Sequence, residues 1–161
     1  MRKKNILIIV LTLLVIVTGC SRQDSTNQQL VRVTRVVDGD TFVVSGGQKV
    51  RLIGIDTPEM VKSGRKTEPF GKEADAFARK LLEGQKVKLV FDVEKKDKYG
   101  RLLAYTYLED GRFINEILVR EGFAQVMTVP PNVAYAEDFV RWQQEARKAG
   151  KGLWGKSKNS N

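Results

Sequence analysis

The sequence contains no histidine and only one cysteine, Cys20, among its 161 residues. The absence of histidine excludes Ser-His-Asp and Cys-His nucleophilic catalysis, paired-histidine ribonuclease chemistry and histidine-ligated zinc. A single cysteine excludes a disulfide within the chain and a site built from several thiolates. A general base near neutral pH must then be a carboxylate, or less often a lysine or tyrosine. Any bound metal must be a hard cation held by oxygen, such as calcium, magnesium or manganese.

Basic residues outnumber acidic ones, with 28 Lys and Arg against 19 Asp and Glu and a net charge of +9. Three of the basic residues occupy positions 2–4, so the rest of the chain carries +6. This excess favours a polyanionic partner such as nucleic acid. It is equally consistent with attraction to anionic lipid headgroups.

Residues 1–19 have the pattern of a secretory signal segment. A basic start precedes an apolar stretch at residues 6–17, which is shorter than the roughly 20 residues of a membrane span. Thr18 and Gly19 before Cys20 resemble a bacterial lipoprotein cleavage box, which predicts a lipid on Cys20; an uncleaved N-terminal anchor is the alternative. Residues 20–29 are polar and are predicted to form a flexible tether. The folded part would then lie outside the cell membrane, held by the lipid or partly released.

The pattern of residues 30–155 predicts one α+β domain. Turn signals and approximate alternation indicate five strands, at residues 30–37, 41–45, 48–55, 86–91 and 102–108. Apolar residues at helical spacing indicate three helices, within residues 70–81, 113–118 and 135–146. Because a closed barrel leaves no exposed strand edge, we predict an OB-fold, five-stranded antiparallel β-barrel with three α-helices. A polar tail follows at residues 156–161.

Two acidic clusters follow predicted strands. Asp38 and Asp40 flank Gly39, which is typical of an ordinary turn, but two crowded carboxylates could also favour a divalent cation. Asp56 and Glu59 follow the third strand, where Asp56 could equally cap a turn. The sequence alone leaves both interpretations open.

Arg51 lies among apolar residues in the third predicted strand. A buried arginine there needs an acidic or phosphate partner. Arg51 and Asp56 are five residues apart, so a regular strand would direct them to opposite faces. They can meet only if the strand bends, and Gly54 is the candidate position.

The segment 97–101, Asp-Lys-Tyr-Gly-Arg, could be a solvated hairpin loop. Alternatively, Arg101 could bind a phosphate through its bidentate guanidinium group. Tyr99 could stack on a base or hydrogen-bond a phosphate oxygen. Lys98, with Lys95 and Lys96, would add non-specific attraction to a phosphate backbone.

Taken together, these motifs resemble those of the staphylococcal nuclease family over about residues 31–154. The resemblance rests on residues 37–41 (VDGDT), 51–59 (RLIGIDTPE), 70–71 (FG), 97–101 (DKYGR) and 115–119 (NEILV). It implies an OB-type barrel with three helices in a monomeric protein. It also implies calcium-dependent cleavage of DNA and RNA to 3′-phosphate products.

The resemblance assigns roles to the acidic residues by their positions. Asp40, Asp56 and the backbone carbonyl of Thr57 would bind calcium. Asp38 would be a nearby acidic residue that does not itself contact the ion. Glu59 would be the general base toward the attacking water.

The remaining roles concern the nucleotide. Arg51 and Arg101 would hold the phosphate and stabilise its developing charge, while Lys98 and Tyr99 would contact a nucleotide phosphate. Two tyrosines that contact the base in the family have no counterpart in residues 126–130, which read Val-Met-Thr-Val-Pro. Base contacts are therefore expected to differ.

Two other functions are compatible with part of the sequence. The first is a catalytically inert OB-fold lipoprotein that binds nucleic acid, and the second is a basic protein that binds envelope polyanions. The presence of two Asp, one Glu and two Arg at catalytic-type positions favours the nuclease over the first. The second leaves the acidic clusters without a role.

Overall fold

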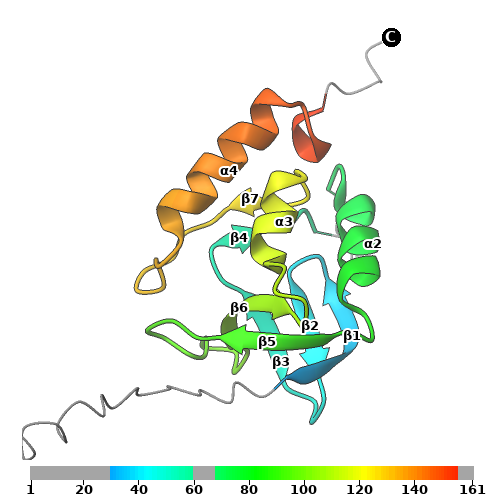
Figure 1. The fold of residues 1–161 in the computed structure, drawn as a ribbon, viewed down its shortest axis with the longest axis vertical. Coiled ribbons are helices and arrows are strands. Elements are labelled where there is room, and N and C mark those ends of the chain that lie inside the picture. Colours follow the sequence, from blue (N-terminus) through cyan, green and yellow to red (C-terminus); the bar gives the residue numbers. More distant parts are fainter. Residues whose placement is uncertain (1–29, 60–67, 156–161) are drawn as a thin grey trace, which may run out of the picture.

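The computed structural model describes residues 30–59 and 68–155 of the chain (Figure 1). The predicted signal segment, the lipid on Cys20, the tether and the polar tail lie outside these residues. Within them, no helix has the length and apolar character needed to cross a membrane.

Five strands form a closed barrel in the order β1-β2-β3-β6-β5. They are β1 (Val31–Asp38), β2 (Thr41–Val44), β3 (Lys49–Leu52), β5 (Lys86–Val90) and β6 (Leu102–Leu108). The predicted five-stranded barrel is confirmed, but β3 and β6 are parallel, with Val50 beside Leu102. Wholly antiparallel pairing is therefore wrong. Strands around a closed ring can alternate in direction only when their number is even, so a ring of five needs a parallel pair.

Three helices and a short 3-10 helix lie together on one side of the barrel, in the upper half of Figure 1. They are α2 (Gly71–Leu82), α3 (Ile114–Arg120), α4 (Ala136–Lys148) and η1 (Gly152–Trp154). The three predicted helices are confirmed. The helical spacing of apolar residues accounts for the packing, because α4 buries Phe139, Trp142 and Ala146 along one face.

The third predicted strand ends earlier than its sequence suggests. After β3, the chain turns at Gly54, where φ is +79°, and continues as β4 (Ile55–Asp56), which leaves the barrel to pair with β7 (Gln125–Val126). A Cβ atom on Gly54 would lie 2.3 Å from the Phe139 ring of α4. Both the positive φ and this contact require glycine. Helix α4 therefore packs directly on the turn that separates Arg51 from Asp56.

Asn115, near the start of α3, joins β6 to the turn that follows β3, and the residue is 0% exposed. Its Oδ1 accepts a hydrogen bond from Thr106 N at 3.0 Å, and its Nδ2 donates to the Ile53 carbonyl at 2.9 Å. We expect Asn115→Ala to lower the free energy of unfolding by about 3 kcal/mol, because two buried backbone groups lose their partners. Urea unfolding measures this loss, and exposed Gln125→Ala serves as the control. A loss below about 1 kcal/mol would contradict the role of Asn115.

Candidate functional site

Arg51 is the residue around which the candidate site is built, and it is only 8% exposed. Its Nη1 donates to the carbonyl oxygens of Leu52 and Ile55, at 2.9 and 2.8 Å. Its Nη2 donates to Asp56 Oδ1 at 2.8 Å, and its Nε lies 3.2 Å from Asp40 Oδ1. The predicted bend therefore brings Arg51 and Asp56 together, and the buried guanidinium group has two acidic partners.

The two acidic clusters lie against each other. Asp40 Oδ2 accepts hydrogen bonds from the backbone N of Thr57 at 2.9 Å and from its Oγ1 at 3.1 Å. Asp40 Oδ1 accepts a third from Thr41 Oγ1 at 3.0 Å. The contact is close, since a Cβ atom on Gly39 would lie 2.6 Å from Thr57 Oγ1. The glycine in the first cluster is thus a packing requirement as well as a turn residue.

The Asp40 carboxyl group has a pKa raised from its ordinary value of 3.8 to about 6. Burial is the largest cause, because it disfavours the charged form. Asp38 and Asp56 raise the pKa further through their charges, while Arg51 and the hydrogen bond from Thr57 N lower it. Negative charge is therefore crowded here in a way that a divalent cation would relieve.

Glu59 follows this cluster and is exposed. Within the described residues, its carboxylate makes no hydrogen bond or ion pair, so the side chain is free to act on a bound molecule. Its backbone is held more firmly, because Glu59 N donates to Glu68 Oε2 at 3.1 Å. A Cβ atom on Gly71 would lie 2.7 Å from the Glu59 carbonyl oxygen. The start of α2 thus fixes the chain at Glu59.

Lys98, Tyr99 and Arg101 come together on the loop before β6. Asp97 organises this loop, since its Oδ1 accepts from Tyr99 N and Arg101 N at 2.9 Å, and its Oδ2 accepts from Arg101 Nε at 2.6 Å. Burial raises the pKa of Asp97, but the hydrogen bonds from Arg101 and Tyr99 outweigh it and leave the pKa below its ordinary value. Tyr99 is 72% exposed, with Lys98 Nζ 5.1 Å from its ring centroid.

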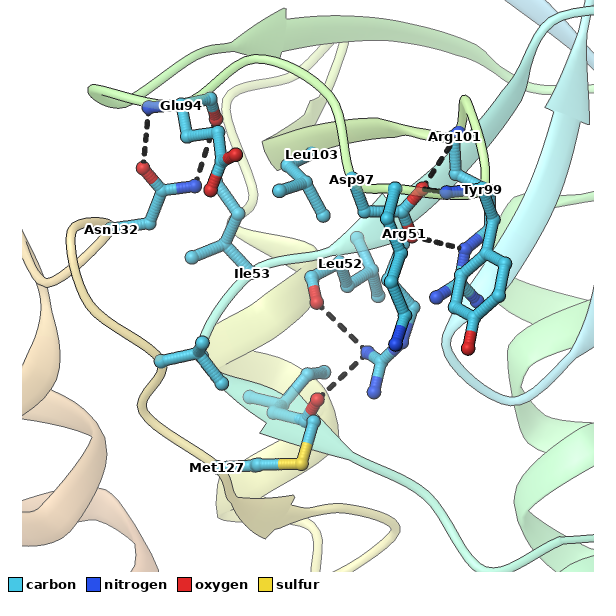
Figure 2. A pocket seen from close by; sticks show the side chains of 14 residues that line it. Arg51, Leu52, Ile53, Glu94, Asp97, Tyr99, Arg101, Leu103, Met127 and Asn132 are labelled. Carbon is cyan, nitrogen blue, oxygen red and sulfur yellow. Dashed lines mark hydrogen bonds and ion pairs between the residues drawn. The ribbon is translucent and has the colours of Figure 1, made fainter.

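Arg51 and Arg101 line one pocket of about 520 Å³ (Figure 2). Apolar side chains form much of the remaining wall, among them Ile53, Leu103 and Met127. Asp40, Asp56, Thr57 and Glu59 do not line this pocket, but Asp40 and Asp56 contact Arg51 on its wall. Arg51 therefore connects the acidic cluster to the pocket.

Two residues of this pocket, Glu94 and Asn132, were not predicted from the sequence. Asn132 is 4% exposed. Its Oδ1 accepts from Glu94 N and its Nδ2 donates to Glu94 O, both at 2.8 Å. The two residues are 38 positions apart, and Glu94 lies in a charged run that resembles a solvated loop, so no local signal identifies the pair.

The donor set of the acidic cluster suits a hard cation. Asp40 and Asp56 could provide carboxylate oxygens, and Thr57, whose backbone N and Oγ1 bond Asp40, could provide its backbone carbonyl oxygen. Across residues 30–59 and 68–155, no group of three or more acidic or thiol side chains forms a ready-made metal site. A cation here would therefore depend on two carboxylates, a backbone oxygen and oxygen atoms from water or substrate, which is the mixed set that calcium accepts.

Comparison with known proteins agrees with this geometry. Residues 49–156 match the family model described as staphylococcal nuclease homologue. The chain is 43% identical over 133 residues to a thermonuclease of Staphylococcus hyicus, covering 81% of this chain and 78% of that protein. It is 46% identical over 125 residues to a thermonuclease of Staphylococcus intermedius, covering 76% and 74%. It is also 42% identical over 141 residues to the endonuclease YncB of Bacillus subtilis, covering 83% and 66%. The chain belongs to the staphylococcal nuclease family.

Proposed function

We propose that this protein is a calcium-dependent, sugar-nonspecific nuclease that hydrolyses phosphodiester bonds of DNA and RNA to 3′-phosphate products. The names of its relatives, thermonuclease and endonuclease, support nuclease activity. The observation that carries the proposal is the position of Arg51, which lines the pocket and contacts both Asp40 and Asp56. A guanidinium group in this position could bind a phosphate beside the carboxylates that would hold the cation.

Substrate binding would begin with the two arginines. Among the described residues, only Nε of Arg101 is bonded, so its two Nη groups can donate two parallel hydrogen bonds to a phosphate. Of the five donors of Arg51, three bond protein oxygen atoms and Nε faces Asp40, so one Nη2 donor remains for the phosphate beside the positive charge of the group. Arg51 is held by four oxygen atoms, so its position is set before substrate arrives. Because both groups would bind more strongly as negative charge grows on the phosphorus, they would favour the transition state over the ground state.

Hydrolysis would then need a cation and a base. Asp40, Asp56 and the Thr57 carbonyl would hold calcium, which when bound neutralises phosphate charge and favours attack by water. Glu59 would accept a proton from the attacking water or orient it. A bond forms between the water oxygen and phosphorus, the bond to the 5′ oxygen breaks, and that oxygen leaves as a hydroxyl group after gaining a proton. The 3′ side keeps the phosphate.

Digestion of single- and double-stranded DNA and of RNA, with calcium and then with chelator, tests the proposal. We expect cleavage of all three substrates in calcium, and none in chelator. Salt-sensitive binding without cleavage under any divalent metal would instead indicate an inert nucleic-acid-binding module.

The raised pKa of Asp40 gives a prediction with a defined sign. A carboxyl group whose pKa is higher in the folded than in the unfolded state stabilises the fold most at low pH, and this contribution is lost as the pH rises through about 6. In chelator, we expect wild type to lose stability relative to Asp40→Asn as the pH rises from about 4 to about 7. Calcium should restore stability at the higher pH in wild type but not in Asp40→Asn.

Thermal unfolding across this pH range, with and without calcium, measures the difference between the two proteins. Asp38 and Asp56, which also face Asp40, are present in both and cancel in the comparison. A stability difference that does not change with pH would contradict the crowded negative charge at Asp40. Equal stabilisation of both proteins by calcium would contradict Asp40 as a ligand.

We also propose that the domain acts outside the cell, tethered to the membrane by a lipid on Cys20. The support is the sequence pattern alone, in which small residues precede Cys20 and a polar tether follows it. Cys20→Ala should prevent incorporation of labelled fatty acid and move the protein from the membrane fraction. Retention of Cys20→Ala in the membrane would indicate an uncleaved N-terminal anchor instead.

A further inference from the structure

The pocket has two chemically different ends, which Figure 2 shows on opposite sides of the view. One end carries Arg51 and Arg101 with Tyr99, and the other carries Glu94 with Asn132. Apolar side chains lie between them. A molecule that fills this pocket must therefore present an anionic group at one end and a flat or apolar body in the middle. At the far end it must present a group that is compatible with a carboxylate.

Glu94 is held in place by its backbone. The buried Asn132 side chain bonds both the N–H and the carbonyl of Glu94, so the Cα atom has a fixed position at the edge of the pocket. In Figure 2 the Glu94 carboxylate points toward Ile53, on the pocket wall.

The charge of Glu94 is not neutralised by the residues that the structure describes. Within them, its carboxylate makes no ion pair and accepts no hydrogen bond. The other acid on the pocket wall, Asp97, differs because Arg101 pairs with it at 2.6 Å. Glu94 is thus the acid of this pocket that remains available to accept a hydrogen bond from a bound molecule.

A nucleotide fits this order of groups, since its phosphate, sugar and base follow one another. With the phosphate at the two arginines, the base would lie over the apolar wall and direct its edge to Glu94. A carboxylate accepts hydrogen bonds but cannot donate them, so it favours a base edge that carries an amino group. Cytosine, adenine and guanine carry such a group. Thymine and uracil carry no amino group, and their one donor on this edge, the ring N3–H, lies between two carbonyl oxygens that a carboxylate repels.

We propose that Glu94 is a specificity-determining residue that selects bases with an exocyclic amino group over thymine and uracil. This inference rests on the proposed nuclease function and on the same pocket. It concerns a side chain that none of the catalytic roles uses. The only aromatic ring among the described residues that line the pocket, that of Tyr99, lies at the arginine end, and the wall near Glu94 is formed by side chains such as Ile53 and Leu103.

Two measurements test the role of Glu94. Binding of oligo-dC and oligo-dU of equal length, measured in chelator, compares two pyrimidines that carry an amino group or a carbonyl oxygen at the same ring position. Limited digestion of single-stranded DNA of random sequence, followed by sequencing of product ends, gives the base preference beside the cut. Both use wild type, Glu94→Ala and Glu94→Gln, with Glu109→Gln as a control that removes an exposed charge outside the pocket.

We expect wild type and Glu109→Gln to prefer oligo-dC by about fivefold and to show a similar depletion of thymine at one position beside the cut. Glu94→Ala should abolish the preference. Glu94→Gln should shift it toward uracil and thymine, because its amide can donate to their carbonyl oxygen. Preferences that stay the same in both Glu94 variants, or a change in affinity that is equal for every base, would overturn the proposal.

These outcomes are separable from failure of the nuclease function. If wild type binds oligo-dC in preference to oligo-dU but does not cleave DNA in calcium, the nuclease proposal fails and the role of Glu94 stands. If wild type cleaves DNA, but Glu94→Ala changes neither the sequence of the product ends nor the ratio of oligo-dC to oligo-dU binding, the nuclease proposal stands and the role of Glu94 fails.

Discussion

Arg51→Lys is expected to lower turnover by on the order of a thousandfold, which is the effect of removing a preorganised group that stabilises transition-state charge. The structure gives two reasons why lysine cannot replace this arginine. An ammonium group has three N–H donors, against five in the guanidinium group, so it cannot bind a phosphate in addition to the oxygen atoms that hold Arg51. Nor can it reach the carbonyl oxygens of Leu52 and Ile55 together with Asp40 and Asp56. Steady-state cleavage of a short oligonucleotide in saturating calcium measures the loss.

Arg101→Lys separates the catalytic effect from the structural one. Arg101 is partly exposed and bonds Asp97 alone among the described side chains, so its replacement should lower turnover with little change in thermal stability. Arg51→Lys should lower both, with a loss of about 1–3 kcal/mol in the free energy of unfolding because buried carbonyl groups lose their donor. Turnover close to that of wild type in Arg51→Lys would contradict its role at the phosphate.

Glu59→Gln is expected to reduce turnover by about 10²–10⁴-fold, the usual contribution of a general base. Glutamine keeps the size of the side chain but cannot accept a proton from water near neutral pH. Because the Glu59 side chain is exposed and has no partner among the described residues, the unfolding temperature and calcium affinity should stay close to those of wild type. Single-turnover cleavage, together with calcium titration followed by thermal shift, measures all three quantities.

Glu73→Gln, an exposed change in the first turn of α2, is the matched control and should retain full turnover. If Glu59→Gln keeps more than about a tenth of wild-type turnover, a group other than Glu59 must accept the proton from the attacking water. If it instead loses calcium binding, Glu59 acts in holding the cation rather than as the base.

Much of the candidate site could be predicted because its signals are local. A buried arginine needs an acidic partner, two residues five apart on a strand need a bend to meet, and glycine is the residue that permits one. The structure shows all three at Arg51, Asp56 and Gly54. The strands and helices were predicted for the same reason, since their periodicity lies within single segments.

The features that could not be predicted depend on contacts between distant segments. Asn132 fixes Glu94 across 38 positions, and nothing near either residue indicates the pairing. The third strand was predicted to continue to residue 55 because its apolar run continues, whereas β4 leaves the barrel to pair with β7. The parallel pairing of β3 with β6 follows from closure of the whole ring and from no single segment.

The packing of α4 on the turn at Gly54 links catalysis to local unfolding. Phe139 contacts this turn, and the turn positions Asp56 against Arg51. Detachment of α4 would release the turn while the barrel strands kept their hydrogen bonds to one another. Proteins open in such partial steps at free energies below that of global unfolding. Activity should therefore disappear on heating before the barrel melts, and amide hydrogens of α4 should exchange faster than those of β6.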